Sequence, residues 1–252
     1  TITISLRRGR FPVAPQGIPT ANTQQKETQM KFNFVPAKEY KSFLKRKTKE
    51  HMNFELGNKY LYDLCKIHPR HEKEDEIHAK VWLIGRAYAA AIERGRSGDG
   101  SSDRFYRDEV IPAFMKNGKK LDAGIAKLNA SEGGFRENTE NALALHKQLL
   151  DIIYRITKKE KRSLISKYLH FHCPDLVPIY DSRVCAAARK IVNRPVIPND
   201  WKKKKFDAEY ATFFARILAI AEEIEKKTGD QVKPRDIDDF LLDFEARHHR
   251  HS

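Results

Sequence analysis

Lys167 and Asp181 are the two residues of this chain whose types and spacing best suit chemistry. They lie fourteen residues apart, within the segment that spans residues 162–192. A carboxylate that caps a helix is held by backbone N–H groups and by the positive end of the helix dipole. A lysine and such an aspartate on neighbouring elements can form an active site, or they can serve the structure alone.

Two helices and a connection framed by prolines are expected to position this pair. Apolar residues at helical spacing predict a short helix around Lys167. Pro174 cannot continue that helix, and Pro178 favours an extended backbone at the residue before it. Asp181 then offers an N-cap to an alanine-rich helix over residues 183–192. The lysine and the aspartate are thereby expected on neighbouring elements.

The chain after residue 34 is patterned for helices. Apolar residues recur at spacings of three and four, most clearly over residues 72–94, and no convincing strand pair or fixed repeat is visible. The sequence therefore predicts an all-α fold of roughly nine or ten helices. Besides the two helices above, helices are expected over residues 36–52, 55–67, 72–94, 103–117, 121–128, 139–156, 206–227 and 236–247.

Two regions are expected along the chain. Residues 1–34 are rich in basic residues and prolines, and their first six residues, T-I-T-I-S-L, alternate like one short strand. We interpret residues 1–34 as an extended basic arm that covers a surface or contacts phosphate. Residues 35–252 are expected to form the all-α domain, either as one unit or as two helical lobes, 35–135 and 136–252.

The charge balance points to a polyanionic partner. The 252 residues carry a formal net charge of +14, with a pI of about 9.6. Such a balance favours nucleic acid, DNA more than RNA, although a basic surface that serves solubility alone would have the same composition. No apolar run reaches the roughly 18 to 20 residues that span a membrane, so no membrane partner is expected. The oligomeric state expected is a monomer.

The cysteines and histidines do not indicate a metal centre. Three cysteines, Cys65, Cys173 and Cys185, lack any C-x-x-C pairing, which is typical of buried thiols in a reducing compartment such as the cytoplasm. Cys173 follows an H-x-H sequence, but one such group does not assemble a four-ligand zinc site. The usual phosphate loops are also missing. The sequence thus predicts no metal and no cofactor.

A strongly basic turn precedes Lys167 and suits phosphate binding. A short turn between helices presents backbone N–H groups and cations together, which is a natural contact for a nucleic-acid backbone. A second basic run, W-K-K-K-K, begins at Trp201. The expected nucleic-acid-binding residues are Arg155, Lys158, Lys159, Lys161, Arg162, Ser163, Arg183, Lys202 and Lys203.

Here the chain resembles the helix-hairpin-helix DNA glycosylases. The resemblance lies in the basic turn, in S-K-Y-L around Lys167, and in V-P-I-Y-D-S-R-V from Val177 to Val184. It covers about residues 143–192, roughly a fifth of the chain. Tyr180 is one residue extra within the last segment. Two features differ from the family pattern: the hairpin carries lysine, arginine and serine where the family usually has glycines, and the spacing from Lys167 to Asp181 is shorter than the family's.

The resemblance implies excision of a damaged or modified base that is first turned out of the duplex. Asp181 would stabilise positive charge on the sugar or activate the nucleophile. Lys167 would attack C1′ as a neutral amine, giving a Schiff base and then strand cleavage. Candidates for the pocket that receives the base are Trp82, Arg86, Tyr168, His170 and Tyr180.

Two other function classes are compatible with the same residues. The first is a non-catalytic nucleic-acid-binding protein that uses the basic turn, the W-K-K-K-K segment and the N-terminal arm. The second is a helical adaptor whose charge is incidental. In either class Lys167 would be a helix residue without chemistry, and Asp181 only a cap.

Overall fold

The computed structural model describes residues 32–47, 52–94 and 101–249, and within these ranges the all-α prediction is confirmed. The only pairing of extended backbone there is an isolated antiparallel bridge between Phe32 and Val192. The strand predicted over the first six residues lies outside the described ranges. The helices are α1 (Pro36–Arg46), α2 (Met52–Ile67), α3 (Glu74–Ala87), α4 (Ser102–Phe105), the π-helical turn η1 (Tyr106–Val110), α5 (Ile111–Asn129), α6 (Thr139–Thr157), α7 (Arg162–His172), α8 (Ser182–Ile191), α9 (Asn199–Lys203), α10 (Ala208–Thr228) and α11 (Pro234–His249).

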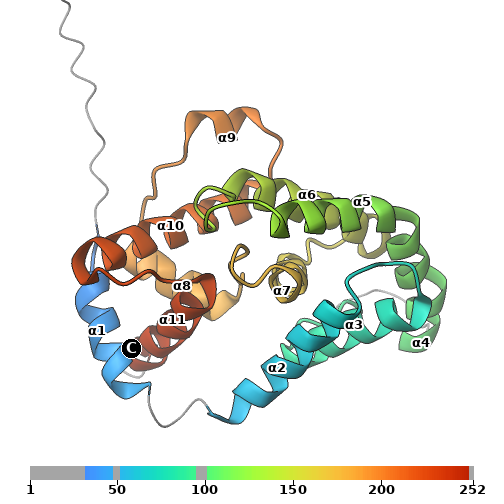
Figure 1. Cartoon of the computed structure of the whole chain (residues 1–252), viewed down its shortest axis with the longest axis horizontal. Coiled ribbons are helices and arrows are strands. Elements are labelled where there is room, and N and C mark those ends of the chain that lie inside the picture. Colours follow the sequence, from blue (N-terminus) through green and yellow to red (C-terminus); the bar gives the residue numbers. More distant parts are fainter. Residues whose placement is uncertain (1–31, 48–51, 95–100, 250–252) are drawn as a thin grey trace, which may run out of the picture.

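The helix that carries Lys167, α7, lies at the centre of the molecule. Figure 1 shows α6 on one side of it and α2 and α3 on the other, and all three pack against it. Every residue of α7 from Leu164 to His172 is buried. A helix enclosed on all faces buries its polar side chains too, and these need hydrogen-bond partners inside the protein.

A second group of helices forms around α8. Helices α10 and α11 pack against α8, and α1 packs against both α10 and α11. Aromatic rings join them: Tyr40 of α1 meets Phe240 of α11 edge to face, with ring centroids 5.6 Å apart. Although α1 comes first among the described helices, its packing partners come from the C-terminal half of the chain.

Helix boundaries differ from the sequence prediction where tertiary packing overrides local signals. The helices expected over residues 103–117 and 121–128 are parts of one helical run through α4, η1 and α5. The helix expected over residues 72–94 ends at Ala87, and Ala89 has a left-handed φ of 50°. The stretch expected to be a linker before residue 206 contains the short helix α9, which buries Trp201.

Gly118 lies within α5, and its missing side chain lets the segment at His71 approach the helix closely. A Cβ at Gly118 would lie 2.7 Å from the carbonyl oxygen of His71, whereas a Cβ at Gly57 in α2 would meet nothing within 4 Å. We expect Gly118→Ala to lower the free energy of unfolding by about 2 kcal/mol through overpacking. The matched variant Gly57→Ala is expected to raise it by up to about 1 kcal/mol, because alanine favours the helix. Urea unfolding measures both, and equal shifts would contradict the close approach.

None of the described helices combines the length and the apolar character that crossing a membrane requires.

Candidate functional site

The structure places Lys167 and Asp181 in direct contact. Lys167 Nζ donates to Asp181 Oδ2 at 3.0 Å, to Ser163 Oγ at 2.9 Å and to the backbone carbonyl of Tyr88 at 3.3 Å. An ammonium group has three donors, so these acceptors match its capacity. The Lys167 side chain is only 2% exposed. Its charge is therefore buried, paired and fully hydrogen-bonded.

Tyr88 contributes to this contact because it directly follows α3. The last carbonyls of a helix have no partner within the helix and carry its partial negative charge. Lys167 satisfies the Tyr88 carbonyl, and its Nζ also lies 5.6 Å from the centroid of the Tyr88 ring. The early end of α3, at Ala87, is what brings this carbonyl to α7.

Asp181 is the solvent-facing member of the pair. Its backbone is extended, with φ −129° and ψ 148°, and its side chain caps α8 by accepting from the N–H of Arg183 at 3.0 Å. The other carboxylate oxygen accepts from Lys167, and 29% of the side chain is exposed. A carboxylate that accepts from the first N–H groups of a helix and from an ammonium group is fixed in direction.

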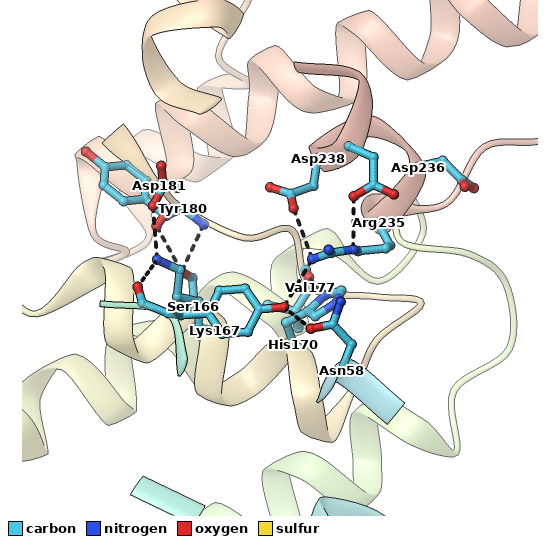
Figure 2. A network of polar contacts seen from close by, with 12 residues as sticks. Asn58, Ser166, Lys167, His170, Val177, Tyr180, Asp181, Arg235, Asp236 and Asp238 are labelled. Atoms are coloured by element: carbon cyan, nitrogen blue, oxygen red, sulfur yellow. Dashed lines mark hydrogen bonds and ion pairs between the residues drawn. The ribbon is translucent and has the colours of Figure 1, made fainter. Parts of the chain in front are cut away.

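Ser166 anchors the connection between α7 and α8 next to the pair. Its hydroxyl donates to the carbonyl of Ser163 at 3.2 Å. It also accepts from the N–H of Tyr180 at 2.9 Å, as Figure 2 shows. Because Tyr180 directly precedes Asp181, this contact fixes where the cap begins. The proline-framed connection is thus tied to the helix from which it folds back.

A second ion pair, from α11, faces the first. Arg235 Nη1 lies 3.1 Å from Asp238 Oδ2, and Figure 2 shows these two residues across from Lys167 and Asp181. Asp238 is 5% exposed, and among the described residues its Oδ1 has no hydrogen-bond partner. Burial raises the pKa of Asp238 to about 7; Asp239 and Asp181 add to this, while Arg235 and Lys167 oppose it.

Arg235 joins this pair to the rest of the site. Its Nε lies 3.2 Å from Asp239, and its Nη1 lies 3.4 Å from the hydroxyl of Tyr88, which donates to Asn58 Oδ1 at 2.6 Å. Burial lowers the pKa of Arg235, but the nearby Asp238, Tyr88 and Asp239 outweigh it, so that its pKa is raised. The guanidinium therefore stays charged inside the network.

Sequence reasoning did not select Arg235, Asp238 or Tyr88 as site residues. The only local signal is an arginine three residues before an aspartate on one helix, and such pairs are common on solvated helix faces. What makes them a site is their place across from Lys167 and Asp181, and nothing in the local sequence specifies that place. Tyr88 likewise reads as a helix-face residue.

Tyr168 and His170 lie in the core, away from any surface where a base could stack. The Tyr168 hydroxyl is 2.7 Å from His71 Nε2. His170 contacts the Val177 carbonyl through Nδ1 at 2.8 Å and the Tyr62 hydroxyl through Nε2 at 2.7 Å. Burial lowers the pKa of His170 to about 4, so the ring is neutral. Both differ from the expectation of a base pocket because α7 is enclosed on all faces.

The other candidates for the base pocket have separate places. Trp82 and Arg86 are exposed on α3, with the guanidinium 5.9 Å from the indole centroid, and Arg86 also pairs with Glu93. The Tyr180 side chain is half-buried and its hydroxyl donates to Glu209. The structure therefore does not bring these residues together around Lys167.

Some basic residues of the turn between α6 and α7 are exposed, and others are held in contacts within the protein. Arg155, Lys158 and Lys159 are exposed, and Lys158 ends α6 with a left-handed φ of 52°. Lys161 Nζ donates to the carbonyl of Arg94. Arg162 binds Asp207 through two hydrogen bonds of 2.8 and 2.9 Å and also pairs with Glu160 and Glu209.

The remaining predicted phosphate contacts follow the same division. The Ser163 hydroxyl accepts a hydrogen bond from Lys167 and so lies beside the Lys167–Asp181 ion pair. Arg183 is exposed beside the Asp181 cap. Lys202 and Lys203 are exposed on α9, which Figure 1 shows protruding from the body of the molecule. The exposed members of the predicted set are therefore Arg155, Lys158, Lys159, Arg183, Lys202 and Lys203.

Comparison with known proteins identifies no relative. No protein-family model, curated protein or solved structure matches the chain. Within the part of the chain that the structure describes, no group of three or more histidine, cysteine, aspartate or glutamate side chains could hold a metal ion. The function is therefore inferred from the chemistry of the site itself.

Proposed function

We propose that this protein binds DNA and excises a damaged or modified base. The observation that carries the proposal is the Asp181 carboxylate, whose side chain is 29% exposed while the ammonium group that binds it is buried. It is fixed by an N–H of α8 and by an ammonium that is 2% exposed. A preorganised charge at the surface suits a reaction in which the opposite charge develops on a ligand.

Base excision is such a reaction. As the bond from C1′ to the base breaks, its electron pair leaves with the base and the sugar becomes positively charged. A carboxylate beside C1′ stabilises that charge and takes a proton from the attacking water as the bond from oxygen to C1′ forms. Asp181 can do both because one oxygen binds the α8 N–H and the other binds Lys167, leaving further lone pairs free.

The contacts of Lys167 support water as the nucleophile. An attacking amine must lose a proton and reach C1′, but Lys167 donates to three oxygens and is buried. In this arrangement Lys167 is a positioning residue that orients Asp181. The sequence interpretation, in which the amine itself attacks, requires these three contacts to open.

Exposed cations support nucleic acid as the partner. Arg155 lies in the last turn of α6, Lys158 and Lys159 lie in the turn between α6 and α7, and the net charge is +14. Each phosphate that they neutralise should contribute a slope of roughly −0.9 to the dependence of log affinity on log salt. These residues equally support the second candidate, a non-catalytic nucleic-acid-binding protein. The free, buried Cys65, Cys173 and Cys185 support a reducing compartment such as the cytoplasm.

Asp181→Asn tests the proposal. Asparagine keeps the N-cap but supplies no charge, so base release should fall by at least about 100-fold while duplex binding by the folded protein is nearly unchanged. Stability should also fall, because the buried Lys167 ammonium loses its counter-charge. The assay uses duplexes that each carry one uracil, hypoxanthine, 8-oxoguanine or alkylated adenine, followed by alkaline cleavage of the abasic site. Asp175→Asn is the matched control, because Asp175 is 61% exposed and its ion pair among the described residues is the surface contact with Lys233.

Borohydride separates the two nucleophiles. Attack by water leaves no imine, so wild-type protein should release base without a covalent protein–DNA adduct. An adduct that disappears in Lys167→Gln would show that the amine attacks. Duplex binding without release from any substrate would favour the non-catalytic candidate, and base release that survives in Asp181→Asn would reduce Asp181 to a cap.

A further inference from the structure

A pocket of about 220 Å³ lies between α8 and α10. From α8, Cys185 and Arg189 face it one turn apart, and four residues of α10 line the opposite wall at helical spacing. Lys167 and Asp181 are not among the lining residues, but Tyr180, which directly precedes Asp181, is, so the pocket lies beside the candidate site. The lining residues are Tyr180, Cys185, Arg189, Glu209, Thr212, Phe213 and Arg216.

Arg216 places a fixed charge in this pocket, and no described carboxylate forms an ion pair with it. Its Nε donates to the carbonyl of Val192 at 3.0 Å, and its Nη2 donates to the carbonyl of Asn193 at 3.1 Å. These contacts orient the guanidinium but bring no negative charge. Burial, followed by repulsion from Arg189, lowers the pKa of Arg216. Two arginines therefore face the same space and repel each other.

The carboxylate of the pocket does not balance the two arginines. Glu209 accepts from the Tyr180 hydroxyl and lies 3.0 Å from Arg162, whereas Arg189 is 4.0 Å away. Its charge is thus shared first with Arg162, which does not line the pocket. An excess of positive charge remains on the side formed by Arg189 and Arg216.

The other walls define the kind of ligand. The rings of Tyr180 and Phe213 meet edge to face with centroids 5.2 Å apart, and they add apolar surface to the lining of the pocket. Burial raises the pKa of the Cys185 thiol to about 12, so it is neutral at physiological pH. The pocket therefore combines the two guanidinium groups with the uncharged side chains of Tyr180, Phe213 and Cys185. Guanidinium groups suit an anion with several oxygens.

We propose that this pocket binds a phosphate group, carried either by a nucleic-acid strand or by a small free anion. Arginine forks match the geometry of phosphate oxygens, and a bound phosphate would replace the repulsion between Arg189 and Arg216 with two attractions. The inference does not rest on base excision, because no lining residue takes part in that chemistry. It adds a ligand site to the chain whether or not the protein is an enzyme.

Arg216→Gln and Arg189→Gln test the pocket. Both variants should bind phosphate roughly tenfold more weakly, because each removes one charge-assisted contact. The probes are inorganic phosphate, pyrophosphate, and one single strand prepared with either a 5′-phosphate or a 5′-hydroxyl, measured by calorimetry and fluorescence anisotropy at low salt. Arg194→Gln is the matched control, since Arg194 is exposed close in sequence to α8 but does not line the pocket. The Arg189 side chain is 58% exposed, so Arg189→Gln should fold and can test the pocket even if Arg216→Gln does not fold.

The outcomes separate the two sources of phosphate. Preference for the 5′-phosphorylated strand, lost in both pocket variants, assigns the pocket to a strand. Binding of inorganic phosphate without such a preference assigns it to a free anion. The proposal is overturned if Arg194→Gln weakens binding as much as the pocket variants do, or if no phosphate probe binds. Base release is a different readout and is expected to survive in both pocket variants.

Discussion

Arg162→Ala is expected to lower the free energy of unfolding at pH 7 by about 3 to 5 kcal/mol, the cost of breaking a buried ion pair. Arg162 begins α7 and binds both carboxylate oxygens of Asp207, at 2.8 and 2.9 Å. Asp207 is 8% exposed and caps α10 by accepting from the Tyr210 N–H at 2.7 Å. In Arg162→Ala, the Asp207 carboxylate stays buried and keeps the hydrogen bond from the Tyr210 N–H, but it loses its counter-charge.

The pH dependence of this loss provides a second check. Burial raises the pKa of Asp207, but the hydrogen bonds from Arg162 and from the Tyr210 N–H outweigh it, so the pKa lies below its usual value. In Arg162→Ala burial dominates and the pKa should rise instead. A carboxyl whose folded pKa exceeds its unfolded pKa destabilises the protein as pH rises. The loss of unfolding free energy in Arg162→Ala should therefore be largest at neutral pH and should become smaller toward pH 4.

Lys159→Ala is the control for Arg162→Ala. Lys159 lies on the same turn but is exposed, so its loss should change stability by less than about 0.5 kcal/mol and should flatten the salt dependence of DNA binding. Urea unfolding and binding titrations measure the two effects. If Arg162→Ala were stable but bound DNA more weakly, Arg162 would be the phosphate contact that the sequence suggested.

Asp238→Asn is expected to flatten the pH dependence of stability between about pH 4 and pH 7. The folded-state pKa of Asp238 is about 7, against a usual value of 3.8. In this window the folded state therefore holds a proton that the unfolded state has released, and stability falls as pH rises. The full span corresponds to about 4 kcal/mol at most, at 1.36 kcal/mol for each pKa unit. Asparagine keeps the shape and an acceptor for Arg235 but does not titrate.

Unfolding free energies measured at several pH values would test this. Asp236→Asn, on the same helix, is the control. Asp236 is 37% exposed, and within the described ranges it forms one ion pair, with Lys47 at 3.6 Å, so its removal should leave the profile unchanged. The groups that set the Asp238 pKa are Arg235 and Asp239 on α11, Asp181 at the start of α8 and Lys167 on α7. A wild-type profile retained in Asp238→Asn would show that Asp238 does not hold a proton at neutral pH.

Local sequence determined the elements around the candidate site. Apolar periodicity predicts the helices, because a helix must bury one stripe of its surface. Pro174 and Pro178 end one helix and extend the chain, and Asp181 caps the next. All these effects act over a few residues. They suffice to place Lys167 and Asp181 on neighbouring elements, as the 3.0 Å contact shows.

Only the tertiary structure decided which of these side chains face solvent. The sequence treats Arg162 and Lys159 as equivalent cations, but Asp207, 45 residues after Arg162, occupies one and leaves the other free. The local sequence allows Tyr168 and His170 to lie at the surface, but α2, α3 and α6 pack around α7 and bury them. Asp238 becomes a raised-pKa acid only through burial beside α7 and α8. Exposure and charge compensation depend on contacts between distant segments, and such contacts leave no periodic trace in the local sequence.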